Sequence, residues 1–438
     1  MTENFEGAHT PAVAFITLGC AKNEVDTAHM KTRLVQAGFT LVDDPACADA
    51  VVVNTCSFIQ SATEESLEAV FDAADLPNVA AGAPLVVAGC MPARYGDDLA
   101  EELTEARAFV PCSREDDIAQ VLAEALEVPL LLKSEGEAVV VEESSASSFA
   151  YVKISDGCDR FCSYCTIPYI RGRYHSFPFK NIRAEVAAHV AAGVAEIVLI
   201  AQDTGRWGTD FEEPSSLAHL VAALAEEFSD TWFRIMYLQP EGVTDAYLDA
   251  VATHPNVCSY FDIPLQHVDA TILRAMNRTG SRAEFEALIK RILARVPDAT
   301  LRTTLIAGFP GETEEQFEEL CDFVEEGLFD YVGVFPYSRE DGTRAAELPD
   351  QVDDDEKADR AQRVRDLADT VSAPRIAARI GREMDVLVEG AEEDGQLYGR
   401  AMCQAPEVDG VTYLPSGEPG EMVRVRIVDT LLYEMEGE

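Results

Sequence analysis

Short apolar runs separated by helical spacing dominate the first third of the chain. Three of these runs are Ala12–Leu18, Ala50–Val53 and Pro84–Ala88. Strands of a parallel sheet are buried on both faces, so they consist of continuous apolar runs rather than alternating ones. A helix is predicted over Ser61–Ala73, with Ser61 to Glu64 forming a capping box at its start. Residues 11–130 are therefore predicted to form an open parallel α/β sheet domain.

A second series of strand-like runs begins at Phe149. The six runs are Ala150–Ile154, Ile197–Ile200, Phe233–Leu238, Tyr260–Pro264, Leu301–Ile306 and Tyr331–Phe335. Helical spacing fills most of the gaps, for example over Asn181–Ala192 and Arg282–Ala294. Six such units predict a partial (β/α) barrel over residues 149–373, with its site at the carboxyl ends of the strands. Residues 131–148 lack periodicity and are rich in serine, which predicts a linker.

The last part of the chain changes pattern again. A charged helix is predicted over Asp353–Ser372, and Pro374 is expected to end it. Four short strands separated by Gly-rich turns follow, at Glu383–Glu389, Gln396–Met402, Val411–Leu414 and Met422–Asp429. Residues 375–438 are therefore predicted to form a small antiparallel β-barrel of the OB type.

The charge balance is extreme for a chain of 438 residues. There are 34 Lys and Arg against 79 Asp and Glu, a net charge of −45. Such a surface repels nucleic acid and attracts basic partners, although an acidic proteome in the source organism would explain it equally well. No apolar run is long enough to span a membrane, and the acidic start Met1–Glu6 does not resemble a secretion signal. We expect a cytoplasmic protein.

Three of the eleven cysteines follow predicted strands of the first domain. Cys20, Cys56 and Cys90 each stand just after an apolar run. Because the carboxyl ends of parallel strands share one edge of the sheet, these three side chains are expected to meet there. The alternative is three unreactive buried thiols. The odd number of cysteines does not indicate a disulfide framework, and their clustering favours metal ligation in a reducing compartment.

The second group of cysteines forms a C-x3-C-x2-C motif directly after the first strand of the predicted barrel. Its members are Cys158, Cys162 and Cys165. Three thiolates are one fewer than a structural zinc site or a fully ligated cubane cluster needs. Zinc is an alternative if His175 supplies a fourth ligand. An iron–sulfur cluster with one open iron fits the spacing better, and such an iron can bind S-adenosylmethionine for reductive cleavage.

With Tyr164 before its last cysteine, this motif resembles that of the radical S-adenosylmethionine superfamily. Together with Cys20, Cys56, Cys90 and the small C-terminal barrel, it is similar to the methylthiotransferases over nearly the whole chain. The resemblance implies two [4Fe-4S] clusters, one held by each set of three cysteines, and a C-terminal TRAM domain.

Within that family the chain resembles the RimO subfamily. The matching segments are Gly19–Asp26, Asp262–His267 and Ser338–Thr343. Ala21 departs from a proline that is common there, and the C-terminus lacks a tryptophan often present. The resemblance implies methylthiolation of an aspartate β-carbon in a basic small-subunit ribosomal protein, or in the subunit itself. It further implies that one S-adenosylmethionine methylates a cluster-held sulfur while a second yields the radical that abstracts hydrogen from the aspartate.

Other residues are predicted to shape the cofactor pocket through the same resemblance. Tyr164, Gln202, Asp203, Arg302 and Gly308 are expected to contact S-adenosylmethionine. Gln202 and Asp203 would contact its methionine or ribose part, and Gly308, in a Gly- and Pro-rich turn after a strand, would lie near the adenosine. For Arg302, pairing with a substrate carboxylate and a structural ion pair are both open. His267 is either a pocket residue or a structural histidine. An electron donor such as flavodoxin or ferredoxin is implied, and the sulfur donor is not indicated.

The charge of the C-terminal part bears on the substrate. Residues 380–438 hold four basic and fourteen acidic residues, an excess of ten negative charges. A domain that grips tRNA should be basic, whereas an acidic one complements a Lys- and Arg-rich ribosomal protein. A tRNA methylthiotransferase with the same clusters is the first alternative. A non-catalytic iron–sulfur electron carrier or scaffold is the second.

Overall fold

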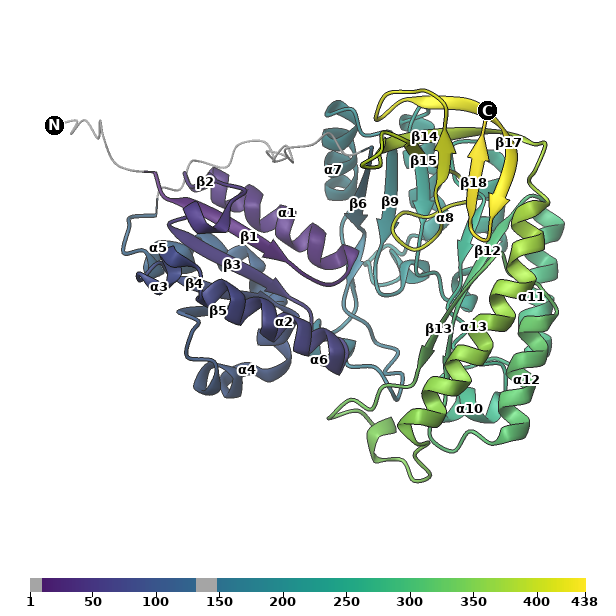
Figure 1. Ribbon diagram of the computed structural model, residues 1–438, viewed down its shortest axis with the longest axis horizontal. Helices are drawn as coiled ribbons and strands as arrows, with labels where there is room; N and C mark the ends of the chain where they lie inside the picture. The colour runs from purple at the N-terminus through teal and green to yellow at the C-terminus, as the bar shows by residue number, and fades with distance from the viewer. Residues whose placement is uncertain (1–9, 131–147) are drawn as a thin grey trace. The chain divides into compact units, whose positions relative to one another are not determined.

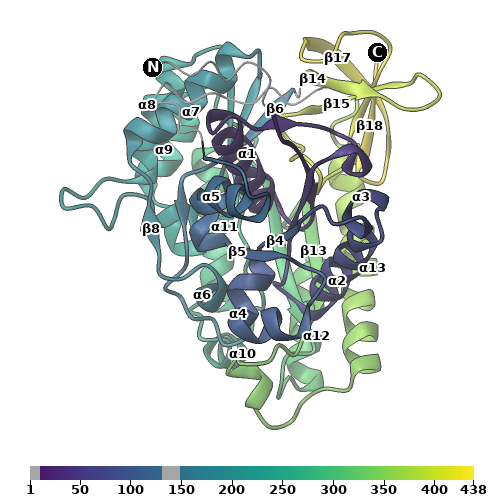
Figure 2. The same ribbon diagram turned by 90° about the vertical axis from the view of Figure 1, so that its left-hand side faces the viewer.

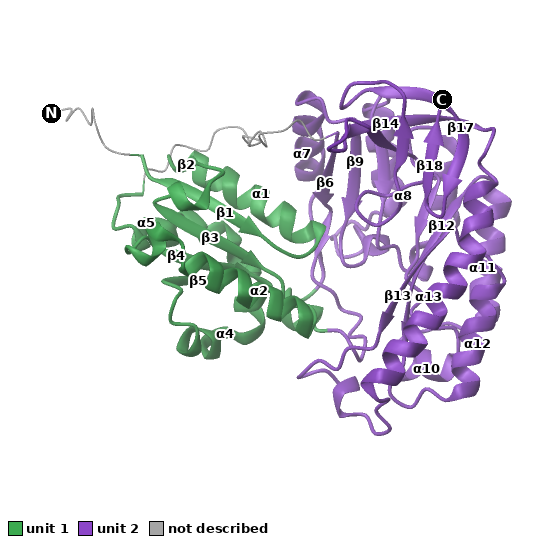
Figure 3. Ribbon diagram, in the orientation of Figure 1, with its two compact units in different colours: residues 1–141, 166–173 green, residues 142–165, 174–438 purple. Residues whose placement is uncertain are grey.

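The computed structural model describes residues 10–130 and 148–438, which divide into two compact units (Figure 3). Unit 1 runs to Val141 and includes Thr166–Arg173; unit 2 consists of Glu142–Cys165 and Tyr174–Glu438. The acidic N-terminal residues and, apart from Ser148, the predicted linker at 131–148 lie outside the described residues.

Unit 1 is built on a parallel five-stranded sheet of order β2-β1-β3-β4-β5, as predicted (Figure 1). Its strands are β1 (Ala12–Thr17), β2 (Thr40–Leu41), β3 (Ala50–Thr55), β4 (Leu85–Gly89) and β5 (Ala108–Pro111). Alternate residues of β3 face opposite sides: Val52 packs in one apolar cluster, and Val51 and Val53 pack in another. Burial on both faces is the reason that the two fully buried strands, β3 and β4, consist mainly of apolar residues.

Helices cover both faces of this sheet (Figure 2). The helices of unit 1 are α1 (Ala21–Gln36), α2 (Gln60–Ala74), α3 (Pro77–Ala80), α4 (Cys90–Glu102), α5 (Ile118–Ala125) and α6 (Ile167–Ile170), with 3₁₀ turns at Pro45–Cys47 and Cys112–Asp117. Met30 and Leu34 of α1 pack with α5 on one face, and Val70 of α2 packs on the other. The predicted capping box at Ser61 is wrong. The helix begins at Gln60, so Ser61 lies inside its first turn, and the N-cap residue Ile59 has no capping side chain.

Unit 2 contains the predicted partial barrel of six parallel strands. They form two three-stranded sheets, β10-β9-β6 and β11-β12-β13, joined by a parallel bridge between Phe233 and Val257. The strands are β6 (Phe149–Lys153), β9 (Glu196–Ile200), β10 (Trp232–Ile235), β11 (Tyr260–Asp262), β12 (Thr300–Ala307) and β13 (Tyr331–Pro336); a small hairpin consists of β7 (Ser155–Asp156) and β8 (His175–Ser176). One large apolar cluster fills the space between these strands and the helices.

The barrel helices follow the strands in alternation (Figure 1). They are α7 (Phe179–Ala191), α8 (Leu217–Glu227), α9 (Asp245–Thr253), α10 (Ala270–Ala275), α11 (Arg282–Arg295), α12 (Glu314–Glu325) and α13 (Asp354–Ala377). The expectation that Pro374 ends the last helix is wrong, because α13 continues through it to Ala377. Ser372 and Ile376 on either side of the proline are fully buried, so packing outweighs the one missing backbone hydrogen bond.

The chain ends in a closed barrel of order β14-β15-β16-β18-β17, which confirms the predicted small barrel. Its strands are β14 (Glu383–Ala391), β15 (Leu397–Ala401), β16 (Thr412–Leu414), β17 (Met422–Leu431) and β18 (Glu434–Gly437). The sequence pattern misses β18, because its four residues include two glutamates and a glycine. This strand closes the barrel by pairing with both β16 and β17.

Buried charges join this C-terminal barrel to the larger one. Glu196 accepts hydrogen bonds from Arg234 at 2.6 Å and from Arg400 at 2.7 Å, and none of the three side chains is more than 1% exposed. Tyr260 donates to Asp409 at 2.6 Å. Glu196 and Tyr260 are the first residues of β9 and β11. The small barrel is therefore held by hydrogen bonds and ion pairs at the amino ends of these strands. The cysteine loop lies at the opposite, carboxyl ends of the barrel strands. Within the described residues, no helix is both long and apolar enough to cross a membrane.

Candidate functional site

The upstream cysteines lie at one edge of the sheet in unit 1. Cys20 immediately precedes α1, Cys56 directly follows β3, and Cys90 follows β4 as the first residue of α4. Because β1, β3 and β4 are neighbours and run parallel, these positions share the carboxyl edge of the sheet. Burial raises the pKa of Cys56 to about 11, with smaller contributions from the nearby Cys90 and Cys20. Three thiols thus converge from separate loops.

Polar side chains fix these loops to one another. The buried Asn23 donates from Nδ2 to the backbone carbonyls of Leu18, 3.0 Å away, and Thr55, 2.9 Å away. The hydroxyl of Thr55 donates to the carbonyl of Ala88 and accepts from the backbone N–H of Met91. Each loop that carries a cysteine is therefore hydrogen-bonded to the next one.

Glycine precedes two of the cysteines for steric reasons. Gly19 has φ +98°, and a Cβ there would lie 2.7 Å from the Cβ of Cys56. Gly89 has φ +95°, and a Cβ there would collide with Asn54 Oδ1 and lie 2.6 Å from the carbonyl oxygen of Thr55. Any larger residue would push the cysteine loops apart.

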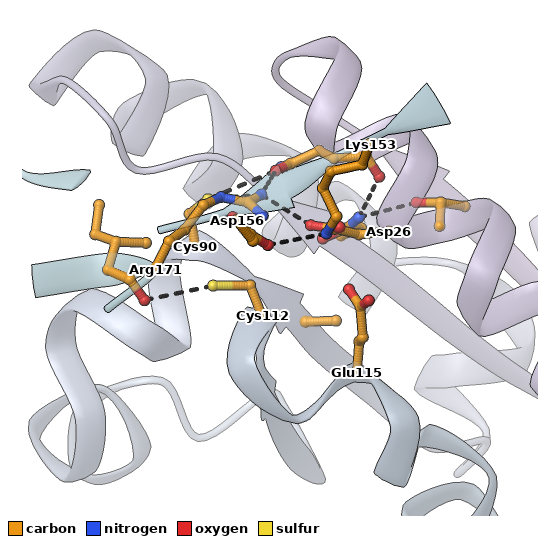
Figure 4. Close-up of polar contacts among 12 residues, drawn as sticks. Asp26, Cys90, Cys112, Glu115, Lys153, Asp156 and Arg171 are labelled. Carbon is orange, nitrogen blue, oxygen red and sulfur yellow. Dashed lines mark hydrogen bonds and ion pairs between the residues drawn. The ribbon is translucent and has the colours of Figure 1, made fainter. Parts of the chain in front are cut away.

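A fourth cysteine lies beside Cys90 (Figure 4). The Cys112 thiol donates to the carbonyl of Ile170 at 3.5 Å. Its contact with Cys90 lowers the pKa of Cys90 to about 7 and raises that of Cys112. The pattern of apolar runs does not reveal Cys112, although this cysteine also follows a strand: β5 has only four residues and ends in Pro111, so the pattern predicts no strand there.

The segment Thr166–Arg173 begins one residue after Cys165 and belongs to unit 1. Thr166 donates to the carbonyl of Phe58, which lies in the loop after Cys56. Arg171 forms a buried ion pair with Asp26 at 2.8 Å, and its guanidinium lies 3.8 Å from Cys90 Sγ (Figure 4). Nothing in the local pattern of the sequence marks Arg171 as part of this edge.

The second set of cysteines lies in the loop that follows β6 and β7 in unit 2. The carboxylate of Asp156, at the start of this loop, accepts from Lys153 Nζ at 2.9 Å (Figure 4) and from Gln202 Nε2 at 2.8 Å. Gly157 and Phe161 have positive φ values of 72° and 48°, which let the chain turn between the cysteines. Burial raises the pKa of the Cys158 thiol, and the charge of Cys162 raises it further.

Residues after α10 hold the other half of this loop. Asn277 donates from Nδ2 to the carbonyls of Arg160 and Phe161 at 2.9 and 3.0 Å. The backbone N–H of Ser163 donates to the carbonyl of Met276. Arg278 lies with one guanidinium nitrogen 3.8 Å from Cys162 Sγ. The cysteine loop is therefore positioned from a segment more than one hundred residues later in the sequence.

Tyr164, between Cys162 and Cys165 in the sequence, packs against an apolar cluster. Its ring packs on a cluster that includes Phe309 and Tyr337. Burial raises the pKa of Tyr164, as does the charge of Cys162. The aromatic residue of the motif thus joins the loop to the turn after β12.

Gln202 and Asp203 follow β9 and contact the residues that flank Cys158. Asp203 Oδ2 accepts from Arg160 Nε at 2.6 Å, and burial raises the pKa of this carboxyl. Gln202 Oε1 and Asp203 Oδ1 are buried and have no hydrogen-bond partner within the described part of the chain. Two oxygen acceptors are thus available beside the cysteine loop for N–H or O–H donors of a small molecule.

Three further residues named from the sequence have partners within the chain. Arg302 binds Asp262 at 2.8 Å and lies 3.7 Å from Asp409 of the C-terminal barrel. The Gly308 N–H donates to both oxygens of Glu312, and a Cβ at Gly308 would collide with Lys357. His267 is fully buried, accepts from the backbone N–H of Asp269 and lies 3.4 Å from Glu312, as a structural histidine would.

The two cysteine sets suit a cluster better than a single ion. Over residues 10–130 and 148–438, no three Cys, His, Asp or Glu side chains close around a one-ion site. In a cubane cluster each thiolate binds a different iron, so the sulfurs need not converge on one point. Each set combines three thiols with an arginine nearby, a donor set that fits a [4Fe-4S] cluster with one open iron.

Three family models match consecutive parts of the chain. Residues 12–111 match the uncharacterized protein family UPF0004, residues 152–324 match the radical SAM superfamily, and residues 380–438 match the TRAM domain. The matches follow the order of the sheet domain, the partial barrel and the small barrel, and they confirm the predicted fold class.

Curated relatives match over almost the full length. A protein of Geobacter sulfurreducens named "Ribosomal protein uS12 methylthiotransferase RimO" is 40% identical, with 97% of this chain and 98% of the relative covered. A protein of the same name from an Anaeromyxobacter species is 42% identical, with 96% and 92% covered.

Solved structures show a related fold. The radical S-adenosylmethionine methyltransferase TsrM from Kitasatospora setae matches with a TM-score of 0.59 and 15% identity, covering 77% of each chain. The cobalamin-dependent radical enzyme OxsB matches with a TM-score of 0.53 and 11% identity, covering 83% of this chain and 58% of that one.

Proposed function

This chain belongs to the RimO family of radical S-adenosylmethionine methylthiotransferases, and from that membership we propose that it inserts a methylthio group into ribosomal protein uS12. The target atom is the β-carbon of an aspartate. The observation that carries the proposal is the full-length identity of about 40% to relatives of that name. The cysteine sets at the carboxyl ends of parallel strands supply the chemistry such an enzyme needs.

Two [4Fe-4S] clusters and S-adenosylmethionine are the cofactors of this family. Cys158, Cys162 and Cys165 would hold one cluster, and Cys20, Cys56 and Cys90 would hold the other. When bound, these groups supply the sulfur, the methyl group and the radical that removes hydrogen from a carbon no side-chain base can deprotonate. Flavodoxin or ferredoxin would deliver the electrons in the cytoplasm.

The chain's own residues would position S-adenosylmethionine. We assign the unpartnered oxygens of Gln202 and Asp203 to its ammonium or ribose donors, since both lie beside the cysteine loop. The ring of Tyr164 would close the apolar side of the pocket, with Gly308 in the turn behind it. The assignment of Arg302 to the cofactor remains a prediction. Its observed carboxylate partners are Asp262 and Asp409. These contacts are the structural ion pair that was the second possibility for Arg302 from the sequence.

The acidic TRAM barrel supports a basic protein as substrate partner. An open cavity of about 480 Å³ on this barrel is lined by the carboxylates of Glu392, Asp394 and Glu436 together with Tyr413. Carboxylates around an aromatic ring suit the Lys and Arg side chains of a ribosomal protein and repel the phosphates of tRNA.

Mass spectrometry of cells that lack the gene tests the proposal. Both uS12 and bulk tRNA are digested and compared with the parent strain, and with strains that carry the wild-type or the Cys158→Ala gene. The methylthio mass should disappear from uS12 alone and return only with the wild-type gene. Loss from tRNA alone would overturn the assignment in favour of a tRNA methylthiotransferase. Purified protein that cleaves no S-adenosylmethionine after anaerobic reduction would instead indicate an electron carrier.

A further inference from the structure

In each set of three cysteines, one sulfur lies against a guanidinium group. A nitrogen of Arg171 lies 3.8 Å from Cys90 Sγ in unit 1, and a nitrogen of Arg278 lies 3.8 Å from Cys162 Sγ in unit 2. The two arginines follow unrelated helices, α6 and α10. An arginine–cysteine contact of the same length therefore occurs in both units, formed by different elements of the fold.

The guanidinium of Arg171 is held in this orientation. It donates to Asn23 Oδ1 and Asp26 Oδ2, both at 2.8 Å, and the side chains of Arg171 and Asp26 are each only 2% exposed. Asn23 is fixed in turn by its bonds to the loops that precede Cys20 and Cys56. The charge of Arg171 cannot swing into solvent.

Arg278 is held by neutral acceptors. One guanidinium nitrogen donates to Gln239 Oε1 at 2.6 Å and to the carbonyl of Pro264 at 2.7 Å, while another faces Cys162. No carboxylate is hydrogen-bonded to Arg278 within the described residues, although the negative charge of Glu241 acts on it from a distance; Arg171, by contrast, forms a direct ion pair with Asp26. The sulfur of Cys162 is therefore the one cluster-ligand atom that this guanidinium contacts among the hydrogen bonds of the described residues.

We propose that Arg171 and Arg278 are positioning residues that each donate an N–H to one ligand sulfur of a cluster and raise its reduction potential. The inference rests on the proposed function, in which these cysteine sets bind the clusters. Reduction adds one negative charge, and a nearby cation with an N–H···S bond stabilises the reduced form more than the oxidised one. Because Asp26 offsets the charge of Arg171, loss of Arg278 should lower the potential more than loss of Arg171.

Full-length proteins with a single cluster allow each arginine to be tested. Cys158→Ala/Cys162→Ala/Cys165→Ala leaves the cluster of unit 1, and Cys20→Ala/Cys56→Ala/Cys90→Ala leaves that of unit 2. Arg171→Gln is placed in the first background and Arg278→Gln in the second. Arg173→Gln and Arg274→Gln are the matched controls, since both arginines are exposed and lie near the tested residues. Midpoint potentials are measured by electron paramagnetic resonance during anaerobic redox titration.

Each Gln variant should shift the midpoint to a more negative potential, with the larger shift at Arg278, while both controls stay at the parental value. Arg171→Lys and Arg278→Lys keep the charge, so they should recover part of the shift and serve where a Gln variant does not fold. Unchanged potentials at equal iron content would overturn this inference alone. Absence of iron and of a cluster signal from the single-cluster parents would overturn the proposed function itself.

Discussion

Gly89 directly precedes Cys90, has a positive φ of +95°, and lies in close contact with the end of β3. A side chain at this position faces Asn54 Oδ1 and the backbone of Thr55, neither of which can move without disturbing β3. The position of Cys90 therefore depends on the absence of a single carbon atom in the residue before it.

Gly89→Ala should destabilise the protein through both backbone strain and overpacking, each about 1–3 kcal/mol. Gly82→Ala is the matched control, because Gly82 also has a positive φ, +112°, but a Cβ at that position would have no atom within 4 Å. Urea unfolding monitored by circular dichroism should show the smaller loss for Gly82→Ala. Equal losses would mean that the crowding at Gly89 relaxes at no cost.

The sequence pattern predicts some residues of the candidate site and misses others. Cys20, Cys56 and Cys90 are predictable because each follows an apolar run that predicts a strand. Cys112 and Arg171 are not, because β5 is short and Arg171 reaches its partners Asn23 and Asp26 across more than one hundred residues of sequence. Contacts of that separation depend on the complete fold, whereas periodicity is a local property.

Helix starts in this chain differ in how they are capped. At α12, Thr313 accepts from the backbone N–H of Gln316 and Gln316 Oε1 accepts from that of Thr313, a complete capping box. At α2, the serine expected to cap the helix lies one residue inside it, and Ile59 at the N-cap offers no acceptor. Two similar sequence patterns thus have different structures, since tertiary packing decides where a helix begins.

Thr313→Ala should cost about 1 kcal/mol of unfolding free energy, because an N–H at the helix start loses its acceptor. Ser61→Ala should change the unfolding free energy by less than about 0.5 kcal/mol, because an exposed residue that caps nothing is lost. Thr313→Ser should restore most of the wild-type value in the same urea titration. A larger loss at Ser61 than at Thr313 would contradict this account of the two helices.

At the scale of the whole molecule, buried ion pairs connect the TRAM barrel to the radical SAM barrel. Arg400 lies at the centre of this network, bonded to Glu196, to Glu389 and to the carbonyl of Gln404, and is 1% exposed. The sequence predicts both barrels but not this connection, because charged residues at strand starts look like solvent-exposed ends. Removing one partner leaves a buried charge without compensation.

Arg400→Met should destabilise unit 2 by about 3–5 kcal/mol, the cost of leaving carboxylates unpaired in the interior. Arg424→Met removes an arginine of the same small barrel that pairs with Asp385 on the surface, and it should cost less than about 1 kcal/mol. Differential scanning calorimetry separates the two outcomes. Similar melting temperatures for the two variants would show that the buried network contributes little.

Acid should weaken the same network. Burial disfavours the charged form of Glu196, but Arg234 and Arg400 outweigh it and lower the pKa of the carboxyl below its ordinary value of 4.5. A lowered pKa in the folded state stabilises the fold above pH 4.5, and this contribution is lost as the pH falls through the folded-state value. The urea unfolding free energy of Glu196→Gln should therefore fall less steeply on acidification than that of the wild type. Parallel curves would contradict this assignment.

The chain leaves unit 1, enters unit 2, and then returns to unit 1 for the eight residues Thr166–Arg173 before leaving again. At a synthesis rate of ~5–20 residues per second, the segment Thr166–Arg173 is therefore translated some seconds after the rest of unit 1. The cation that pairs with Asp26 emerges from the ribosome only after Cys158, Cys162 and Cys165 have been translated. A gene fragment that stops at the apparent end of the first domain lacks Arg171. Unit 1 can therefore complete the surroundings of Cys20, Cys56 and Cys90 only after Cys158, Cys162 and Cys165 have been translated.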